Sequence, residues 1–246
     1  MNRKGVFYFP LLLYLFLLLS LWLLSWFFGV LQLVFNSTFV VGNLITAEGM
    51  RWALRSSLNV VDSAPWGVAM LSVVTYATLA ASGLLRLAGD IFSGRMLAAN
   101  QRRAVAVAAI MLLLYLLLLF ACTVAPWNFL LGASYNISVS PLARGWLLLL
   151  FIAVLSVSLS YGYVYGNFRS IIDILQGVEE NVKMFIPAFL SMLPAVALLS
   201  CMHYMAVFEL MNLNAATVCT IENVVYAFPF VFVLIVRAVI AYRSSR

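Results

Sequence analysis

Three polar side chains near the end of one long apolar run could bind an ion or a small substrate. His203 lies close to the end of that run, Glu209 follows about one and a half helical turns later, and Asn212 comes next. Imidazole and carboxylate groups can carry protons, and a carboxamide can donate and accept hydrogen bonds. Because ionisable groups inside a bilayer are costly, these three are candidate substrate- or ion-binding residues. A histidine packed at the membrane interface is the structural alternative.

Two charged segments interrupt the apolar sequence and could contact a partner protein. The first, "NLITAEGMRWALRSSLNVVDSAPWGV", carries Glu48, Arg51, Trp52 and Arg55; the second, "SIIDILQGVEENVKMF", carries Asp173, Glu179 and Glu180. Helices that lie along a membrane surface have this mixed composition for purely structural reasons. Partner binding is therefore one reading of both segments, and simple interfacial packing is the other.

Catalytic signatures are missing from the sequence. It contains no HExxH, GxSxG, P-loop or CxxC motif. Glu179 and Glu180 are adjacent, so on a helix they point to different faces and cannot form a paired-carboxylate site. Cys122, Cys201 and Cys219 fall in or beside apolar segments, where cysteine usually acts as a small hydrophobe. We therefore predict no enzyme activity, no cofactor and no metal site.

The composition predicts the fold class. Of the 246 residues, 65% are hydrophobic and 9% are charged, whereas soluble domains are about 45–50% apolar and ~25% charged. A membrane span needs about 20 apolar residues. We predict a single all-α, polytopic membrane domain over residues 1–246, with spans near 6–35, 65–85, 104–124, 145–165, 185–208 and 224–242.

The distribution of Lys and Arg predicts the orientation of these spans. With the N-terminus inside, eleven basic residues fall on the cytoplasmic side and three (Arg51, Arg55 and Arg144) on the other. This positive-inside bias places both termini in the cytoplasm. The basic residues form no continuous stripe, so the net charge of +6 does not indicate nucleic-acid binding.

The two charged segments are predicted to be short amphipathic helices, near 46–58 and 170–183. Thr46 and Ser170 are suitable N-cap residues, and in the second helix the apolar residues form one stripe while the charged residues face water. Both helices are expected to lie along the membrane surface.

Glycine and proline positions predict how the spans pack. Gly162 and Gly166 are four residues apart and permit close approach of another helix. Pro187 and Pro194 fall in the fifth span, where each removes an N–H donor and favours a kink. No pair of half-length apolar segments, the usual sign of the broken helices of transporters, appears in the sequence.

Two blocks of the sequence resemble the AbgT family of membrane transporters. The first carries Ala47-Glu48-Gly49, Asn59, Ala64-Pro65, Gly67 and Ser82-Gly83-Leu84; the second carries Ser140-Pro141, Tyr161-Gly162, Gly166 and Asn212. Together they cover about half of the chain. The chain is similar to a shortened, divergent member of that family, because it lacks the stretches in which the family has its re-entrant hairpins.

The resemblance implies a dimeric transporter in a bacterial inner membrane that moves p-aminobenzoyl-glutamate or related aromatic acids with an ion gradient. A non-transporting scaffold or subunit derived from that family is the alternative. It would use its interfacial helices to hold a partner membrane protein. Either way, the partners expected from the sequence are the lipid bilayer and a second copy or another membrane protein.

Overall fold

The computed structural model describes residues 5–35, 42–53, 64–94, 96–123 and 140–244. In this part of the chain every regular element is a helix. Five helices are long and apolar enough to cross a membrane, and a bent pair raises that number to six if it counts as one span. The prediction of an all-α polytopic membrane protein is confirmed.

The described chain divides into two compact units, residues 1–66 with 184–246 and residues 67–183. The first unit contains η1 (Gly5–Tyr8), α1 (Phe9–Phe35), α8 (Ile186–Tyr204), α9 (Val207–Leu210) and α10 (Ala215–Ser244). A further helical stretch covers residues 47–53. Whether residues 1–246 act as one membrane domain stays a prediction.

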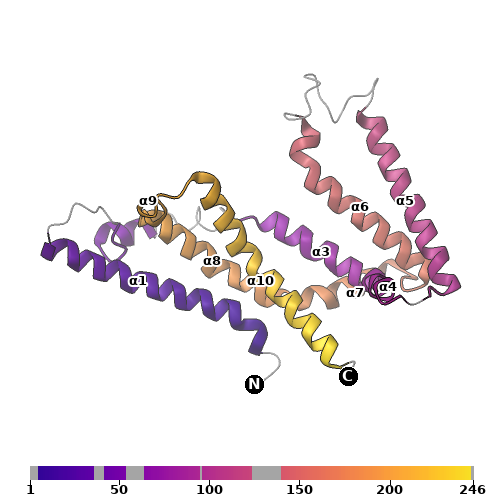
Figure 1. The fold of residues 1–246 in the computed structure, drawn as a ribbon, viewed down its shortest axis with the longest axis horizontal. Coiled ribbons are helices and arrows are strands. Elements are labelled where there is room, and N and C mark those ends of the chain that lie inside the picture. The colour runs from indigo at the N-terminus through magenta and orange to yellow at the C-terminus, as the bar shows by residue number, and fades with distance from the viewer. Residues whose placement is uncertain (1–4, 36–41, 54–63, 95, 124–139, 245–246) are drawn as a thin grey trace. The chain divides into compact units, whose positions relative to one another are not determined.

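In the first unit α8 packs against both α1 and α10 (Figure 1). Tyr14 of α1 lies against Ala195 and Leu198, and its hydroxyl donates a hydrogen bond of 2.6 Å to the carbonyl of Val225. Further along α1, Trp22 packs beside Cys201. α1 and α8 therefore run parallel, and α10 runs antiparallel to both.

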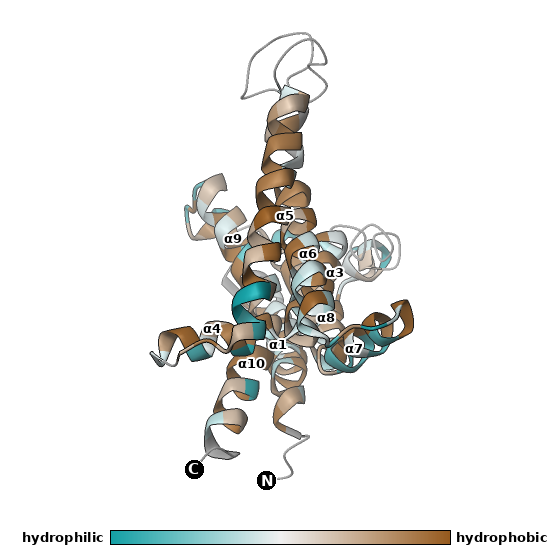
Figure 2. Cartoon of the chain, turned by 90° about the vertical axis from the view of Figure 1, so that its right-hand side faces the viewer, coloured by the Kyte–Doolittle hydropathy of each residue, from teal (hydrophilic) through white to brown (hydrophobic). Residues whose placement is uncertain are grey.

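The second unit contains α3 (Trp66–Ser82), α4 (Leu84–Phe92), α5 (Ala99–Thr123), α6 (Pro141–Tyr165) and α7 (Ile171–Lys183). α5 and α6 form an antiparallel hairpin in which the Tyr115 hydroxyl donates to the Leu149 carbonyl at 2.8 Å. α6 begins at the Ser140 N-cap with Pro141 at its first position, a favourable helix start. Figure 2 shows hydrophobic residues over most of α5 and α6, as expected for helices in contact with lipid.

The second predicted span, 65–85, is not one straight helix. α3 ends at Ser82, and α4 continues at an angle of 70°. Gly83 at the break has φ 88°, a left-handed conformation that glycine adopts without steric cost. This break was not predicted from the sequence, since glycine inside an apolar run gives no sign of one by itself.

Two predicted span ends also differ from the structure. α8 stops at Tyr204 rather than near 208, because Ala206 is left-handed with φ 56° and cannot continue the helix. α10 starts at Ala215, well before the predicted 224. The predicted span began after Glu222, but Glu222 lies inside the helix with a partner.

Both predicted amphipathic helices are present in the described residues. Residues 47–53 are helical, with the Thr46 hydroxyl accepting from the Gly49 N–H at 3.2 Å. α7 begins after Ser170, whose hydroxyl accepts from the Asp173 N–H at 3.2 Å. Both N-caps predicted from the sequence are confirmed. Residues 54–58 of the first helix lie outside the described part of the chain.

Candidate functional site

A histidine–glutamate pair joins two antiparallel helices of the first unit. His203, in the last turn of α8, has its Nε2 atom 2.6 Å from Oε1 of Glu222 on α10. The Nε2–H donates to the Glu222 carboxylate when the imidazole is protonated or in its Nε2–H tautomer, and the contact is an ion pair when the imidazole is protonated. The two side chains are 53% and 31% exposed, so the pair is reachable from outside the protein.

The depth of Glu222 explains why it needs a partner. Glu222 lies seven residues into α10, or about 10 Å along a helix with a rise of ~1.5 Å per residue. A lone carboxylate near the hydrocarbon is costly, and pairing with a hydrogen-bond donor offsets part of that cost. The His203 contact therefore allows α10 to extend through this polar position.

A sharp turn places an aromatic ring against the histidine. After α8 the left-handed Ala206 redirects the chain into α9. A left-handed non-glycine residue costs about 1–2 kcal/mol, so the surrounding contacts must hold it in place. Phe208 of α9 is buried, and its ring lies edge-on to the His203 ring at 4.8 Å. The imidazole therefore contacts both the Phe208 ring and the Glu222 carboxylate.

The helix at 47–53 and the residues just before it pack on the C-terminal end of α8. The Trp52 ring stacks on Tyr204, the neighbour of His203, with centroids 4.4 Å apart. Leu44 is buried beside Cys201, and its N–H donates to the Ser25 hydroxyl at 2.8 Å. The helix at 47–53 is thus attached to α1 and α8 through a tryptophan and a buried leucine, next to the candidate pair.

The other two predicted substrate- or ion-binding residues lie apart from this pair. Glu209 is exposed on α9, and Asn212 follows in the turn to α10 with a left-handed φ of 51°. A backbone hydrogen bond joins them, donated by the Asn212 N–H to the Glu209 carbonyl at 2.9 Å. Among the described residues, the polar contact of the His203 side chain is with Glu222 and not with Glu209 or Asn212.

Sequence reasoning missed Glu222 as a partner of His203. Their spacing in the sequence could have predicted the pair, because His203 lies nine positions before Asn212 and Glu222 lies ten positions after it. Two antiparallel helices joined by a short connection bring residues at equal distance from the turn together. The predicted start of the last span at 224 excluded Glu222 from that comparison.

The charged residues proposed for partner binding occupy solvent-facing positions. Glu48 and Arg51 are exposed on the helix at 47–53, where Trp52 instead faces inward. Arg55 lies outside the described residues. On α7, Glu179 forms an exposed ion pair of 2.8 Å with Lys183, and Glu180 is exposed.

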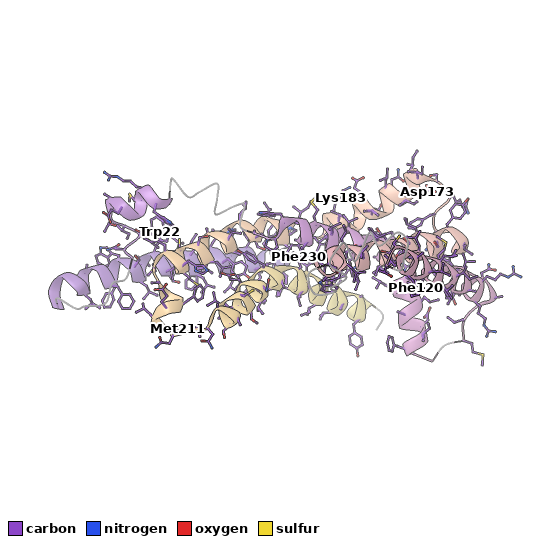
Figure 3. The ribbon with its side chains drawn as sticks, turned by 90° about the horizontal axis from the view of Figure 1, so that it is seen from above. Trp22, Phe120, Asp173, Lys183, Met211 and Phe230 are labelled. Atoms are coloured by element: carbon purple, nitrogen blue, oxygen red, sulfur yellow. The ribbon has the colours of Figure 1, made fainter. Side chains whose placement is uncertain are left out.

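Asp173 has a structural task at the start of α7, near the opposite end from Lys183 (Figure 3). Its carboxylate accepts from the N–H groups of Arg169 and Ser170 at 3.0 and 2.9 Å. These backbone hydrogen bonds lower the pKa of Asp173. At the other end, the hydrogen bond with Lys183 lowers the pKa of Glu179 and raises that of Lys183.

Gly162 and Gly166, the predicted packing glycines, have different structural roles. Gly162 is buried, and a Cβ there would lie 2.4 Å from the ring of Phe168 and 3.1 Å from the Cβ of Ser82. It therefore permits the close approach of α3 and of the turn after α6. Gly166 is the left-handed C-cap of α6, with φ 94°.

The two prolines of α8 are not equivalent. Pro187 lies in the first turn, where its missing N–H interrupts no helical hydrogen bond. Pro194 lies inside the helix, where the N–H of a normal residue would bond to the carbonyl four residues earlier. A loss of helical hydrogen bonding is therefore expected at Pro194 alone.

The break between α3 and α4 is supported by a side chain that sequence reasoning did not select. The carboxamide of Asn167, just after α6, donates a hydrogen bond of 2.7 Å to the Ser82 carbonyl. Unpaired carbonyls at a helix end inside a membrane protein need such a partner. Asn167 therefore stabilises the bend.

No protein-family model, curated protein or solved structure matches this chain. The fold and the candidate site define a polytopic helical membrane protein with an imidazole–carboxylate pair between two of its long helices.

Proposed function

We propose that the chain is a small membrane transporter in which His203 and Glu222 carry the coupling proton. The observation that supports it is the 2.6 Å contact between these side chains, which come from two long apolar helices. Ionisable groups at such positions are characteristic of ion and proton pathways. In this proposal a proton shared by the pair is taken up on one side of the membrane and released on the other as substrate moves.

The proposed substrate class is an aromatic acid such as p-aminobenzoyl-glutamate, as the resemblance to the AbgT family implies. The aromatic side chains around His203 favour this class. Phe208 packs on the imidazole, and Tyr204, the next residue along α8, stacks on Trp52. Aromatic faces bind planar rings, and a protonated histidine attracts a carboxylate.

A non-transporting scaffold or subunit is the second candidate. It is favoured by α7, whose Glu179 and Lys183 form an ion pair on the exposed surface next to the exposed Glu180. Such a charged helix suits a partner protein at the membrane surface. The bacterial inner membrane, cytoplasmic termini and an oligomeric state belong to both proposals.

Substrate uptake by purified protein in proteoliposomes tests transport directly. Labelled p-aminobenzoyl-glutamate should accumulate under an imposed proton gradient, and Glu222→Gln and His203→Ala should reduce the initial rate at least tenfold. Glu209→Gln is the matched control, because Glu209 is a nearby carboxylate outside the pair, and its rate should stay near wild type. Uptake equal to that of empty vesicles under proton and sodium gradients would contradict transport by this chain alone.

In that case, crosslinking from α7 to a partner protein would test the scaffold proposal.

A further inference from the structure

The corner formed by α4, its connection and the start of α5 exposes large apolar side chains. One side of α4 packs inward: Leu87 is buried in a cluster with Ala104, Ala108 and Tyr161. The side of α4 that faces away from Leu87 carries Leu85 and Phe92, which are exposed, and Met96 follows in the connection. Phe92 is 92% and Met96 is 94% exposed. Side chains of this kind are stable at such exposure when lipid rather than water surrounds them.

Arginine side chains surround these apolar groups. On a helical wheel Arg86 lies on the face of α4 opposite the apolar arc, and Arg102 and Arg103 are exposed within the first five residues of α5. In the described part of the chain no carboxylate lies within ion-pair distance of Arg102 or Arg103. Figure 2 shows the hydrophilic residues of this unit gathered on α4, α7 and the start of α5. The start of α5 therefore presents two positive charges that no carboxylate of the described residues pairs with, although Asp90 of α4 lies in the same corner.

The position of these arginines on α5 strengthens the need for an external anion. Cationic side chains at a helix N-terminus face the positive end of the helix dipole, which is unfavourable. α5 carries no acidic residue in its first turn to offset them. A bound anion would interact favourably with both the guanidinium groups and the helix end.

The lengths of the helices place this corner at the membrane surface. α3 has 17 residues, or about 26 Å at ~1.5 Å per residue, close to the ~30 Å of the hydrocarbon core. The 70° bend at Gly83 then directs α4 along the surface instead of onward across the bilayer. The Asn167 hydrogen bond to Ser82 maintains that bend. α4 is thus an interfacial helix that the sequence did not predict.

We propose that this α4–α5 corner binds anionic phospholipid, with Phe92 and Met96 inserted among the acyl chains and Arg102 and Arg103 on the lipid phosphates. Arg86 lies on the water-facing side of α4. The ligand is the headgroup and upper acyl chain of a phospholipid in the adjacent leaflet, which the Lys and Arg distribution predicts to be cytoplasmic. This binding is independent of whether the chain transports a substrate.

Lipid retention by the full chain tests the headgroup contact. The protein is reconstituted in nanodiscs of equal phosphatidylcholine and phosphatidylglycerol, transferred to detergent, and the retained lipids are counted by native mass spectrometry. Wild type should retain phosphatidylglycerol preferentially. Surface arginines contribute roughly fivefold each, so Arg102→Gln with Arg103→Gln should reduce the preference by on the order of 25-fold. Arg51→Gln, an exposed arginine of the first unit, is the control and should retain the wild-type preference. Equal retention of both lipids by wild type, or an unchanged preference in the double variant, would overturn the proposal.

Insertion depth provides a second test that does not depend on the arginine variants. In a chain with Cys122, Cys201 and Cys219 replaced by alanine, a nitroxide label is attached through Phe92→Cys or Arg86→Cys. Accessibility to oxygen and to a water-soluble nickel complex is then measured in phosphatidylglycerol vesicles. The label at 92 should be oxygen-accessible and shielded from nickel, whereas the label at 86 should show the reverse. Nickel accessibility at 92 equal to that at 86 would overturn the inserted position of α4.

Discussion

Two long apolar helices of this protein, α8 and α5, have opposite surroundings. In the most apolar stretch of α8, 56% of the residues are buried, compared with 6% in α5. α8 contains small and polar residues such as Ser191, Ala195 and Cys201, whereas the middle of α5 is mostly leucine. In a bilayer lipid tails are as apolar as leucine, so small residues, not greater hydrophobicity, identify the helix that packs on its neighbours.

The largest expected difference between the two helices concerns leucine truncation. Leu198 of α8 is buried against Tyr14 and Ala195, so Leu198→Ala should leave a cavity and cost about 2–5 kcal/mol. Leu113 of α5 is exposed, and Leu113→Ala should change the free energy of unfolding by less than about 0.5 kcal/mol. Thermal unfolding in one detergent compares the variants. Equal losses would mean that α5 is packed against protein after all.

The His203–Glu222 pair should show a smaller but measurable coupling. A double-mutant cycle with His203→Ala and Glu222→Ala should give an interaction free energy of roughly 0.5–1 kcal/mol, because both side chains are partly exposed and solvent screens the pair. His203→Ala combined with Glu209→Ala should be additive. Additivity in the first cycle would show that the two side chains do not interact in the folded protein.

In the described residues a side-chain hydrogen bond joins the two helices of the hairpin that contains α5. Tyr115→Phe removes the bond to the Leu149 carbonyl and should cost about 0.6 kcal/mol, the average for such bonds in membrane proteins. Tyr163, exposed at the end of α6, is the control, and Tyr163→Phe should have no effect. An equal loss of stability in both variants, or no loss in either, would contradict the assigned role of Tyr115.

The smallest expected effect is a pH dependence at the start of α7. The pKa of Asp173 is lowered by folding, so its contribution is complete above its ordinary value of 3.8 and is lost as pH falls through the lowered value. Hydrogen-exchange protection of the first turn of α7, corrected for intrinsic rates, should be constant at higher pH and fall in acid. Asp173→Asn should have lower protection at neutral pH and little pH dependence. If the wild-type protection profile matched that of Asp173→Asn, the Asp173 carboxylate would not stabilise the start of α7.

The helices could be predicted from the sequence because their signals are local. Runs of about 20 apolar residues identify spans, and Thr46 and Ser170 identified the starts of the amphipathic helices correctly. The bend at Gly83 could not be predicted in this way. It depends on Asn167, 85 positions from Ser82 in the sequence, which supplies the hydrogen bond that the helix end needs.

The candidate site was predicted in part. His203 stood out as an ionisable residue at the end of an apolar run, but its partner is 19 residues away on another helix. The sequence instead directed attention to Glu209 and Asn212, which are nearer along the chain. The left-handed turn at Ala206 separates them from the imidazole, because it ends α8 before they are reached. Such a turn at alanine has no sequence signature.

Substrate-driven proton movement tests most directly whether the His203–Glu222 pair carries the coupling proton. Proteoliposomes containing a pH-sensitive dye receive p-aminobenzoyl-glutamate without an imposed gradient, and the change in internal pH is recorded for wild type, Glu222→Gln and Glu48→Gln. Substrate should acidify the interior in wild type and in the exposed-carboxylate control Glu48→Gln, with at least a tenfold slower change in Glu222→Gln. Acidification at the wild-type rate in Glu222→Gln would contradict the assignment of the coupling proton to this pair.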